Sequence, residues 1–457
     1  DMDRWLYRIT QSLRTALPEE AVARTARATG LVERSGAIDS VPFFWNFLIG
    51  ATQPDGSVTK VNDFYETFTD HDAAYSSIQQ WVTPELKQLL LQTVAHLSVE
   101  VGVAEYDLSG RFGRFRDVLI ADTTDCTLSP ASFDEFPGYS DDHAGAQLHM
   151  IESLASRAPV SASITDVRTD EMDELQIQDW IADSLWLDDL GYHNYGKLAR
   201  IDDFDGWFVN RLKVDSNAPI TEELERWPAG AISLEGEDLQ DVLPELHRSE
   251  IDAKARFNTP SSDSDLLPCE FRLVGLRHDE AAPEKDAPDA DHDYHLYVTN
   301  LPKEWFSARE IAALYSVRWS IEILVLEAKS VFGLDEIPVR RKDAIECFML
   351  AAVVMILLSR YVLGQIRTAF GSARNGPLEE ATETQPLSFS KRLQWFGTDI
   401  LEMLADQLGY VWEPGKVIIE GAIDRNLDRH GLTERVAYGV VSSRFTEAGE
   451  LATLRPG

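Results

Sequence analysis

Four polar side chains recur at helical spacing within residues 314–330, "LYSVRWSIEILVLEAKS". They are a phenol, two cations and a carboxylate: Tyr315, Arg318, Lys329 and Glu322. At about 100° per residue, a helix would place all four on one narrow face, along about 20 Å of its length. Such a face could bind a charged ligand, or it could be a solvated surface with one ion pair between Arg318 and Glu322. The spacing alone leaves both interpretations open.

The opposite side of this helix is predicted to be buried. Apolar residues follow one another there at spacings of four, three, four and three: Val317, Ile321, Leu324, Ala328 and Val331. This stripe predicts that the helix packs against a core and that the four polar side chains point away from the sheet. Ser307 with Glu310 predicts a capping box at the start of the helix, and Gly333 predicts its end. We therefore expect one long helix between Ser307 and Gly333.

The spacing Tyr-(2)-Arg-(3)-Glu-(6)-Lys resembles the signature of a branch of DDE-type insertion-sequence transposases. The segment before it, "YHLYVTNLPKEWFSARE", is also similar to that family, in which a strand ending in "TNLP" leads into the signature helix. The resemblance implies a ribonuclease-H-like fold. It also implies a cut-and-paste transposase that cleaves DNA at the terminal inverted repeats of its insertion sequence and transfers the ends to target DNA.

The same resemblance implies that Glu322 works with two aspartates, one on the first strand of the core and one on the fourth. The three carboxylates would hold two divalent ions, Mg²⁺ or Mn²⁺ in its place, because hard ions prefer carboxylate oxygens. Two ions about 4 Å apart can stabilise both the attacking and the leaving oxygen of a phosphodiester. In "VLIADTTDCTL" the residue that matches is Asp122, with Asp125, beyond the apolar run, as the alternative.

The second aspartate is expected where a strand ends before a Gly-aromatic pair. In "LWLDDLGYHNYG" the Asp-x-Gly-Tyr match favours Asp189, with Asp188 beside it. Adjacent side chains of a strand point to opposite faces, so only one of the two can easily face a metal ion. For Glu322 the competitor is Glu327, which lies about 140° further round the helix and cannot share its face.

The resemblance further implies that Tyr315, Arg318 and Lys329 bind phosphates of the DNA backbone. Arg211, in the strand-like "WFVNRLK", would contact DNA near the site, and Lys213 is a weaker candidate. A surface arginine on an edge strand is the alternative interpretation of Arg211.

Two tryptophans are candidates for a further role that the family implies. Members that cut the second DNA strand through a hairpin hold a flipped base against an aromatic side chain, and stacking is the physical basis. Trp227 and Trp305 could do this, with packing in the core as the alternative for both.

The elements that must position these residues divide the chain into five stretches. We expect a helical DNA-end-binding region over residues 1–115 and a helical C-terminal region, which could serve dimerisation, over 371–457. Between them, residues 116–214 and 294–370 form an α/β core, a mixed sheet flanked by helices, and residues 215–293 form a β-containing insertion.

Within the core, short apolar runs predict strands and one helix before the second aspartate. The strands are expected at about residues 114–124, 146–154 and 159–167, and the helix over residues 173–184. Residues 184–201 predict a strand, a turn and a helix, and three more strands are expected in "WFVNRLK", "CEFRLVGLRH" and "YHLYVTNLP".

The chain is strongly acidic. Its 77 acidic and 42 basic residues give a formal charge of −35, and only 11 of the basic residues are lysine. An acidic, lysine-poor surface stays hydrated in concentrated salt, where the screening length falls to about 3 Å at 1 M. We therefore expect a halophilic protein that works in a cytoplasm with molar salt.

On composition alone, this charge argues against a nucleic-acid partner. The acid is unevenly distributed, however, because residues 131–200 hold 14 acidic and 4 basic residues whereas residues 303–343 hold seven of each. In concentrated salt the gain from counterion release is small, so DNA binding would depend more on hydrogen bonds and shape. The expected partners are double-stranded DNA, as element ends and target, and a second copy of the chain in a synaptic homodimer.

The cysteines and the apolar runs show whether the chain could be a disulfide-bonded, zinc-binding, secreted or membrane protein. Cys126, Cys269 and Cys347 form no CxxC pair, which indicates neither a disulfide framework nor a zinc site. No signal peptide is visible in "DMDRWLYRIT", and the run "CFMLAAVVMILLS" is shorter than the ~20 residues of a membrane span. We expect a cytoplasmic protein in which that run is a buried helix.

Two alternative functions remain open on the sequence. One is a catalytically inactive or domesticated relative that binds DNA, which the presence of Asp122, Asp189 and Glu322 argues against. The other is a different ribonuclease-H-like DNA nuclease, which has no reason to keep the Tyr-Arg-Glu-Lys spacing.

Overall fold

The chain divides into two compact units, each built from several stretches of sequence. The computed structural model describes residues 2–32, 38–53, 56–69, 73–102, 108, 110–140, 143–169, 176–192, 194–213, 216–225, 232–257, 269–277, 294–335, 337–371 and 403–404. The first unit comprises Asp1–Glu105, Thr123–Asp170 and Glu322–Leu427, and the second comprises Tyr106–Asp122, Glu171–Ile321 and Asp428–Gly457. The chain therefore passes between the units inside one strand and inside one helix, and each unit is described by itself.

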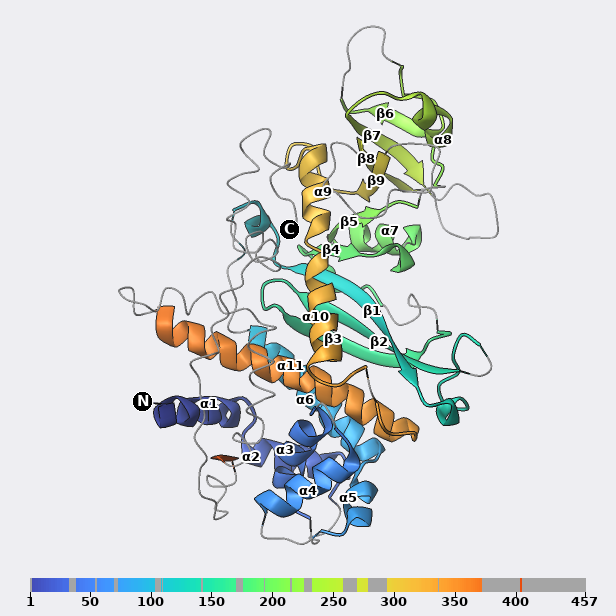
Figure 1. The fold of residues 1–457 in the computed structure, drawn as a ribbon. Helices are drawn as coiled ribbons and strands as arrows, with labels where there is room; N and C mark the ends of the chain where they lie inside the picture. The colour runs from blue at the N-terminus through green and yellow to red at the C-terminus, as the bar shows by residue number, and fades with distance from the viewer. Residues whose placement is uncertain are drawn as a thin grey trace. The chain divides into compact units, whose positions relative to one another are not determined.

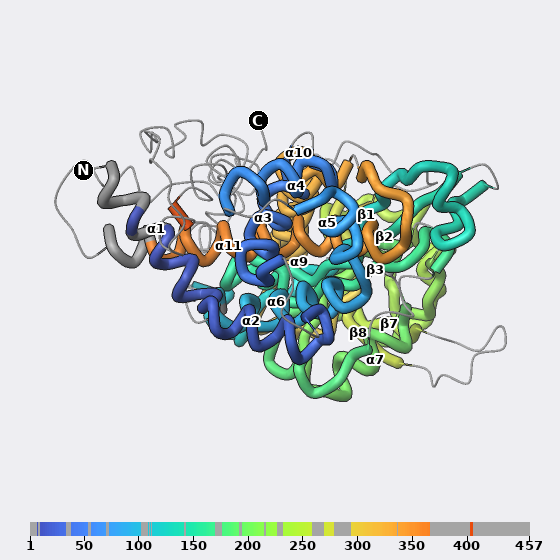
Figure 2. Tube along the Cα trace, turned by 90° about the horizontal axis from the view of Figure 1, so that it is seen from below, coloured from blue at the N-terminus to red at the C-terminus, as the bar shows by residue number. Residues whose placement is uncertain are grey.

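The first unit is mainly helical, as predicted for the N-terminal region. Its helices are α1 (Met2–Ala16), α2 (Glu19–Ala28), α3 (Ser40–Ala51), α4 (Val58–Phe68), α5 (Tyr75–Trp81), α6 (Pro84–Gly102) and α11 (Lys342–Gly371). Every residue of the apolar helix α3 is buried. Helix α11 packs against α1, α3 and α6, and Figures 1 and 2 both show it beside α6.

Helix α11 confirms the prediction of a buried apolar helix. The part from Lys342 to Gln365 is long and apolar enough to cross a membrane, and its most apolar window is wholly buried inside the fold. Ring contacts such as Phe47 to Phe348, at 5.7 Å between centroids, join it to α3. Burial on this scale removes a large apolar area from water and makes α11 the core of its unit.

The first unit also contains an antiparallel hairpin of β2 (Ala144–Ser153) and β3 (Ala158–Asp166). The turn between them includes Arg157, whose φ of 53° lies in the left-handed region. The strand order here is β3-β2-β1, with β1 (Val118–Leu128) shared by both units, and helices α6 and α11 pack against β3. The two strands confirm the predictions for residues 146–154 and 159–167.

The second unit carries the larger part of the sheet (Figure 1). Its strand order is β1-β4-β5-β9-β8-β7-β6, and the strands are β4 (Leu185–Asp188), β5 (Trp207–Arg211), β6 (Ile220–Glu223), β7 (Glu250–Phe257), β8 (Cys269–Arg277) and β9 (Tyr294–Thr299). Strands β1, β4 and β5 are parallel, and β5 to β9 and the strands beyond pair antiparallel. A mixed sheet with flanking helices is the predicted α/β class.

Helices complete the second unit, and short 3₁₀ turns occur in both. The α-helices are α7 (Tyr195–Asp203), α8 (Leu239–Val242) and α9 (Ala308–Ser316), and α10 (Trp319–Ser330) begins here and continues into the first unit. The 3₁₀ turns are η1 (Gly110–Arg114), η2 (Pro130–Ser132), η3 (Asp179–Ile181), η4 (Leu190–Tyr192) and η5 (Leu243–Glu245).

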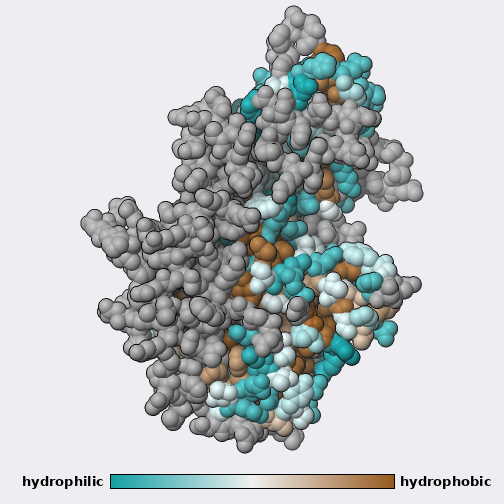
Figure 3. All heavy atoms as spheres, in the orientation of Figure 1, coloured by the Kyte–Doolittle hydropathy of each residue, from teal (hydrophilic) through white to brown (hydrophobic). Residues whose placement is uncertain are grey.

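The insertion is part of this sheet. Its strands β6, β7 and β8 continue the sheet antiparallel beyond β9, with a full register from Glu250↔Leu276 to Phe257↔Cys269. On the face drawn in Figure 3, hydrophilic residues predominate over the β6–β7 end, as the acidic composition leads one to expect. The insertion is therefore joined to the core by main-chain hydrogen bonds along β8 and β9.

The helix predicted over residues 173–184 is wrong for the part that the structure describes. Residues 176–184 contain only the three-residue turn η3. Asp183 has a φ of 59°, which a right-handed helix excludes, and its backbone N–H donates to the carbonyl of Asp205 at 2.9 Å. Its own carbonyl accepts from Arg116, so this backbone leads directly into β4.

All three cysteines are free thiols. Burial raises the pKa of Cys126 to about 12 and that of Cys269 to about 11, so neither forms an appreciable thiolate near neutral pH.

Candidate active site

The carboxyl end of β4 lies beside the middle of β1 in the second unit, which brings two predicted acids to the same level of the sheet. The parallel register pairs Val118 with Leu185 and ends at Ala121 with Asp188. The next residue on each chain is Asp122 on one and Asp189 on the other. Adjacent strands of a sheet lie about 4.8 Å apart. Asp122 and Asp189 each follow the last paired residue of neighbouring strands, so they lie at the same level along the two strands. Asp122 is half-buried and Asp189 is exposed.

The neighbouring Asp188 has a different environment. It is fully buried, and its carboxylate accepts hydrogen bonds from Trp186 Nε1 at 2.6 Å, from the Lys197 ammonium and from the Asn210 amide. Burial raises the pKa of Asp188, and Lys197 with the two other donors opposes that rise. Because both oxygens are engaged inside the protein, Asp188 is suited to a structural role and Asp189 to an external ligand.

Local folding explains how Lys197 reaches this buried acid. Asn194 caps α7 by accepting a hydrogen bond from the Lys197 backbone at 3.1 Å, which fixes the first turn of the helix next to β4. Neither Lys197 nor Asn210 was picked out from the sequence. The only available signal was an acid, Asp188, in an otherwise apolar strand, since such a group needs a buried partner.

The strand that carries Asp122 is longer than its apolar run predicted, because β1 continues to Leu128. Asp125 therefore lies on the same strand, three residues on, and its side chain points to the opposite face from that of Asp122. It is exposed and accepts a hydrogen bond from the Tyr139 hydroxyl at 2.9 Å. The geometry favours Asp122 over Asp125 as the partner of Asp189.

A buried histidine supports the continuation of β1 in the first unit. His149 of β2 lies with Nδ1 3.3 Å from the Thr123 hydroxyl and Nε2 2.8 Å from the Thr165 hydroxyl of β3. These contacts of His149 join β1, β2 and β3 one residue beyond Asp122. His149 was not singled out from the sequence, although a polar residue within the apolar run "AQLHMIESL" was a visible signal.

The signature segment is not one continuous helix, so that expectation is wrong. Helix α9 ends at Ser316, α10 begins at Trp319, and Val317 and Arg318 form a turn between them. The Arg318 N–H donates to the Tyr315 carbonyl at 3.0 Å, a bond to the third residue back, which tightens the chain at this point. The predicted capping box of Ser307 and Glu310 is confirmed.

The expected apolar stripe is buried throughout, but Tyr315 is also buried, contrary to the prediction that it faces away from the sheet. Its ring lies 5.4 Å from that of Tyr297 on β9, and the Arg318 guanidinium lies 5.8 Å from its centroid. Its hydroxyl has no hydrogen-bond partner among the described residues. Burial raises the pKa of Tyr315; Arg318 lowers it, and Asp189 with Asp188 adds to the rise.

The Tyr315 hydroxyl has no hydrogen-bond partner among the described residues, so it can donate to an oxyanion that reaches it. Arg318, half-buried beside it, can supply the positive charge.

The remaining two signature residues belong to the first unit. Glu322 is half-buried in the first turn of α10, and Lys329 is half-buried in the last turn with its ammonium 3.9 Å from Asp335. Glu327, the alternative to Glu322, is fully buried and pairs with both Nη atoms of Arg360, at 2.9 and 2.5 Å. Glu327 is therefore committed to holding α10 against α11.

The carboxylates that the second unit brings together suit a hard cation. Asp122 and Asp189 offer only oxygen donors, which Mg²⁺ and Mn²⁺ prefer. Among the residues that the structure describes, no group of three or more His, Cys, Asp or Glu side chains could hold a metal ion. Asp122 and Asp189 therefore fit the expected metal chemically, as two oxygen ligands. Glu322 belongs to the first unit.

The other predicted DNA-contact residues have ordinary protein partners. Arg211, at the end of β5, is half-buried with Nη2 3.3 Å from His295 Nδ1, and Lys213 is exposed. Trp305 packs at 4.7 Å from Trp207 and beneath the Arg114 guanidinium, which agrees with its alternative role in packing. The second tryptophan, Trp227, lies outside the described residues.

Comparisons with known proteins agree with the resemblance. The family described as "Transposase DDE domain" matches residues 113–358, more than half of the chain. The transposase for insertion sequence element IS231F of Bacillus thuringiensis subsp. israelensis is 24% identical over 214 residues, which cover 43% of this chain and 45% of that protein. The transposase for IS1151 of Clostridium perfringens is 18% identical over 390 residues, covering 79% and 82%. The match thus spans less than half the length of the IS231F relative.

Among solved structures, the chain is similar to one from the cryo-EM structure of a piggyBac transposase synaptic complex with hairpin DNA. The sequence identity is 8% and the TM-score 0.46, over 93% of this chain and 89% of that one.

Proposed function

This chain belongs to the transposase DDE domain family, and from that premise we propose that it is a DNA transposase that moves an insertion sequence by cut-and-paste. In this proposal the mixed sheet is a ribonuclease-H-like core, and the enzyme would cleave DNA at the terminal inverted repeats of its element and join the freed 3′-hydroxyls to target DNA.

The observation that carries the proposal is the register of β1 with β4. It sets Asp122 and Asp189 one residue beyond the last paired residues of adjacent parallel strands, where two carboxylates can share a cation. The commitment of Asp188 and Glu327 to buried ion pairs supports Asp189 and Glu322 as the acids with a catalytic role.

In the proposed mechanism, Asp122, Asp189 and Glu322 hold two divalent ions, Mg²⁺ with Mn²⁺ as a substitute. Bound there, the ions would stabilise the attacking and leaving oxygens of the phosphodiester during in-line displacement. The protein's own contribution is to orient the DNA: Tyr315 donates its unpartnered hydroxyl to a backbone phosphate, and Arg318 supplies a charged donor.

The remaining phosphate contacts are proposed for Lys329 and Arg211, both half-buried. Two copies of the chain would act on paired element ends as a homodimer. With a formal charge of −35, binding in molar salt would rely on such directed hydrogen bonds more than on counterion release.

A cleavage assay tests the proposal. The purified chain in molar KCl with Mg²⁺ should cut a linear DNA that carries the inverted repeats flanking its gene. Asp122→Asn should not cut this DNA but should still bind it, whereas the matched variant Asp125→Asn should cut like the wild type. Cutting by Asp122→Asn at the wild-type rate would refute the site, and an inactive wild type on both repeats would refute the function.

A further inference from the structure

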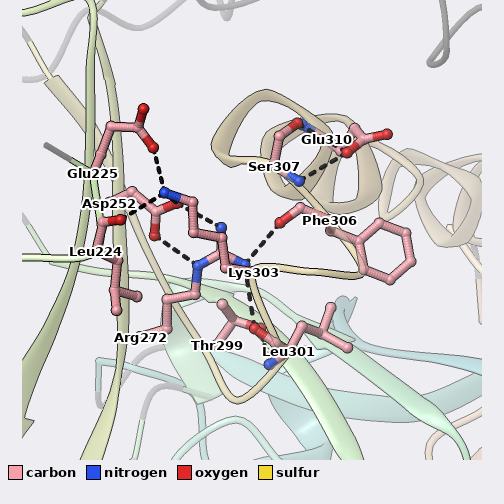
Figure 4. Close-up of polar contacts among 10 residues, drawn as sticks. All are labelled: Leu224, Glu225, Asp252, Arg272, Thr299, Leu301, Lys303, Phe306, Ser307 and Glu310. Carbon is pink, nitrogen blue, oxygen red and sulfur yellow. Dashed lines mark hydrogen bonds and ion pairs between the residues drawn. The ribbon is translucent and has the colours of Figure 1, made fainter.

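We propose that Arg272, in the insertion, is a positioning residue that sets the start of the signature segment. This inference rests on the proposed function for its catalytic consequence, but its structural part can be tested without DNA. Arg272 lies on β8, and the segment it controls is the loop Leu301–Phe306 that leads from β9 into α9 (Figure 4).

Arg272 forms a buried ion pair with Asp252 within the insertion. Arg272 and Asp252 are 5% and 4% exposed, on neighbouring strands β8 and β7. Arg272 Nε donates to Asp252 Oδ1 at 2.7 Å and Nη2 donates to Oδ2 at 2.9 Å, so the pair is bidentate. The geometry fixes the plane of the guanidinium.

The remaining nitrogen of the Arg272 guanidinium binds the loop that leads into α9. Nη1 donates to the carbonyl of Leu301 at 3.2 Å and to the carbonyl of Phe306 at 2.8 Å. These two carbonyls stand at the beginning and the end of the loop, and Figure 4 shows both oxygens directed at Arg272. One side chain from the insertion therefore closes the loop at both ends.

Two further contacts tie the same loop. The Lys303 ammonium donates to the Leu224 carbonyl at 2.7 Å and pairs with Glu225, just after β6. It also lies 3.8 Å from Asp252 Oδ2, so the loop and the insertion share one charged cluster.

At the β9 end, the "TN" of the "TNLP" motif attaches the chain to β5. Thr299 Oγ1 donates to the Phe208 carbonyl at 2.6 Å, and Asn300 Oδ1 accepts from the Phe208 N–H at 2.9 Å. The chain is thereby held on β5 until it reaches Leu301, and from there Arg272 sets its path.

The effect continues directly into α9. Phe306, whose carbonyl Arg272 binds, precedes the N-cap Ser307, and its buried ring stacks on Phe115 at 6.0 Å. Helix α9 is only nine residues long, so its first turn determines where Tyr315 and the following Arg318 lie. The insertion thus positions both proposed phosphate-binding groups without contacting DNA through Arg272.

Lysine cannot reproduce this arrangement. Arg272 makes four hydrogen bonds from three nitrogens held in one plane, whereas a lysine ammonium is a single point with three donors. Arg272→Lys keeps the charge beside Asp252 and loses at least one loop carbonyl. The chain offers a matched control in Arg248, another buried arginine of the insertion, which pairs with Glu223 and donates to the Ile232 carbonyl.

Hydrogen exchange of the full chain tests the structural part. Arg272→Lys should speed exchange of the amides of residues 303–316 by about tenfold while those of β4 and β5 keep wild-type rates. Arg248→Lys should leave residues 303–316 unchanged. Equal exchange of this segment in the wild type and Arg272→Lys, or equal acceleration in both variants, would overturn the proposal. If Arg272→Lys does not fold, Asp252→Asn, which loosens the same guanidinium, should accelerate the same segment, and failure to do so would overturn it.

A kinetic measurement tests the catalytic part on the DNA that carries the element's inverted repeats. Arg272→Lys should lower the cleavage rate at saturating DNA by about tenfold or more and change the apparent Kd for that DNA by less than about threefold, since the positioning of existing contacts is lost. Arg248→Lys should cleave like the wild type. A rate unchanged in Arg272→Lys would refute the positioning role. If the wild type itself does not cleave, the proposed function fails while the exchange result still stands.

Discussion

The end of β4 and the middle of α10 each carry two acids whose environments are opposite. On β4, Asp188 is fully buried with Lys197, and Asp189 next to it is exposed. On α10, Glu327 is fully buried with Arg360, and Glu322, five residues earlier, is half-buried. In both places one acid is fully buried in an ion pair and the other is more exposed.

The comparison shows two environments for carboxylates in an acidic chain, one buried in an ion pair and one nearer to solvent. A buried carboxylate must be paired, because leaving a charge unpaired in the interior is strongly unfavourable. A carboxylate that serves a metal must instead stay near solvent with oxygens that an ion can reach. The buried partner of each pair fixes the backbone, and the accessible neighbour then projects from a rigid support.

The largest expected effect comes from neutralising the accessible acids. Asp189→Asn and Glu322→Gln should each reduce DNA cleavage to background, because each removes a proposed ligand charge. The thermal midpoint should stay within about 2 °C of the wild type, as is usual for surface substitutions. Cleavage assays and calorimetry on the same samples check this, and a variant that melts early and cleaves normally would reverse the assignment.

Neutralising a buried acid should have the opposite result. Glu327→Gln leaves the Arg360 guanidinium buried without its counter-charge, so the free energy of unfolding of the first unit should fall by about 3–5 kcal/mol. Urea denaturation measures this loss. Unchanged stability in Glu327→Gln would show that the two acids of α10 do not differ as described.

A double substitution sharpens the comparison on β4. Asp188→Leu alone should destabilise the second unit by about 3–5 kcal/mol because it strands Lys197, whereas Asp188→Leu with Lys197→Met should recover most of that loss. Urea denaturation of the two single variants and the double variant gives the coupling energy. If the losses of stability in the two single variants simply add in the double variant, Asp188 and Lys197 do not stabilise the second unit as a pair.

The smallest effect concerns Tyr315, a buried polar group that lacks the partners Asp188 has. Tyr315→Phe should leave stability unchanged, since the hydroxyl makes no hydrogen bond among the described residues. It should weaken binding of the element-end DNA by about tenfold, the contribution of one hydrogen bond to a charged group. Filter binding measures this change, and binding of Tyr315→Phe at the wild-type affinity would contradict the proposed contact.

Local patterns were sufficient to predict most of the secondary structure. Short apolar runs predicted β2 and β3, the capping box predicted the start of α9, and a longer apolar run predicted α11. Each of these depends on neighbours a few residues away, which the sequence displays directly.

The features that the sequence could not supply depend on distant residues. The burial of Tyr315 follows from packing against Tyr297, and the path of residues 176–184 follows from bonds to Arg116 and Asp205. The same holds for the partners of Asp188, because β4, α7 and β5 must be assembled before they meet. Tertiary contacts of this kind override local preference.

The most direct test of the central claim is to map the metal on the protein itself. With Fe²⁺ in place of Mg²⁺ and ascorbate with peroxide, the wild-type chain should be cut near residues 122, 189 and 322, and excess Mg²⁺ should suppress all three cuts. Asp189→Asn should abolish the cuts, whereas Asp125→Asn should keep them. Cuts that persist in Asp189→Asn, or that fall elsewhere in the chain, would contradict the assignment of Asp122, Asp189 and Glu322 as one metal site.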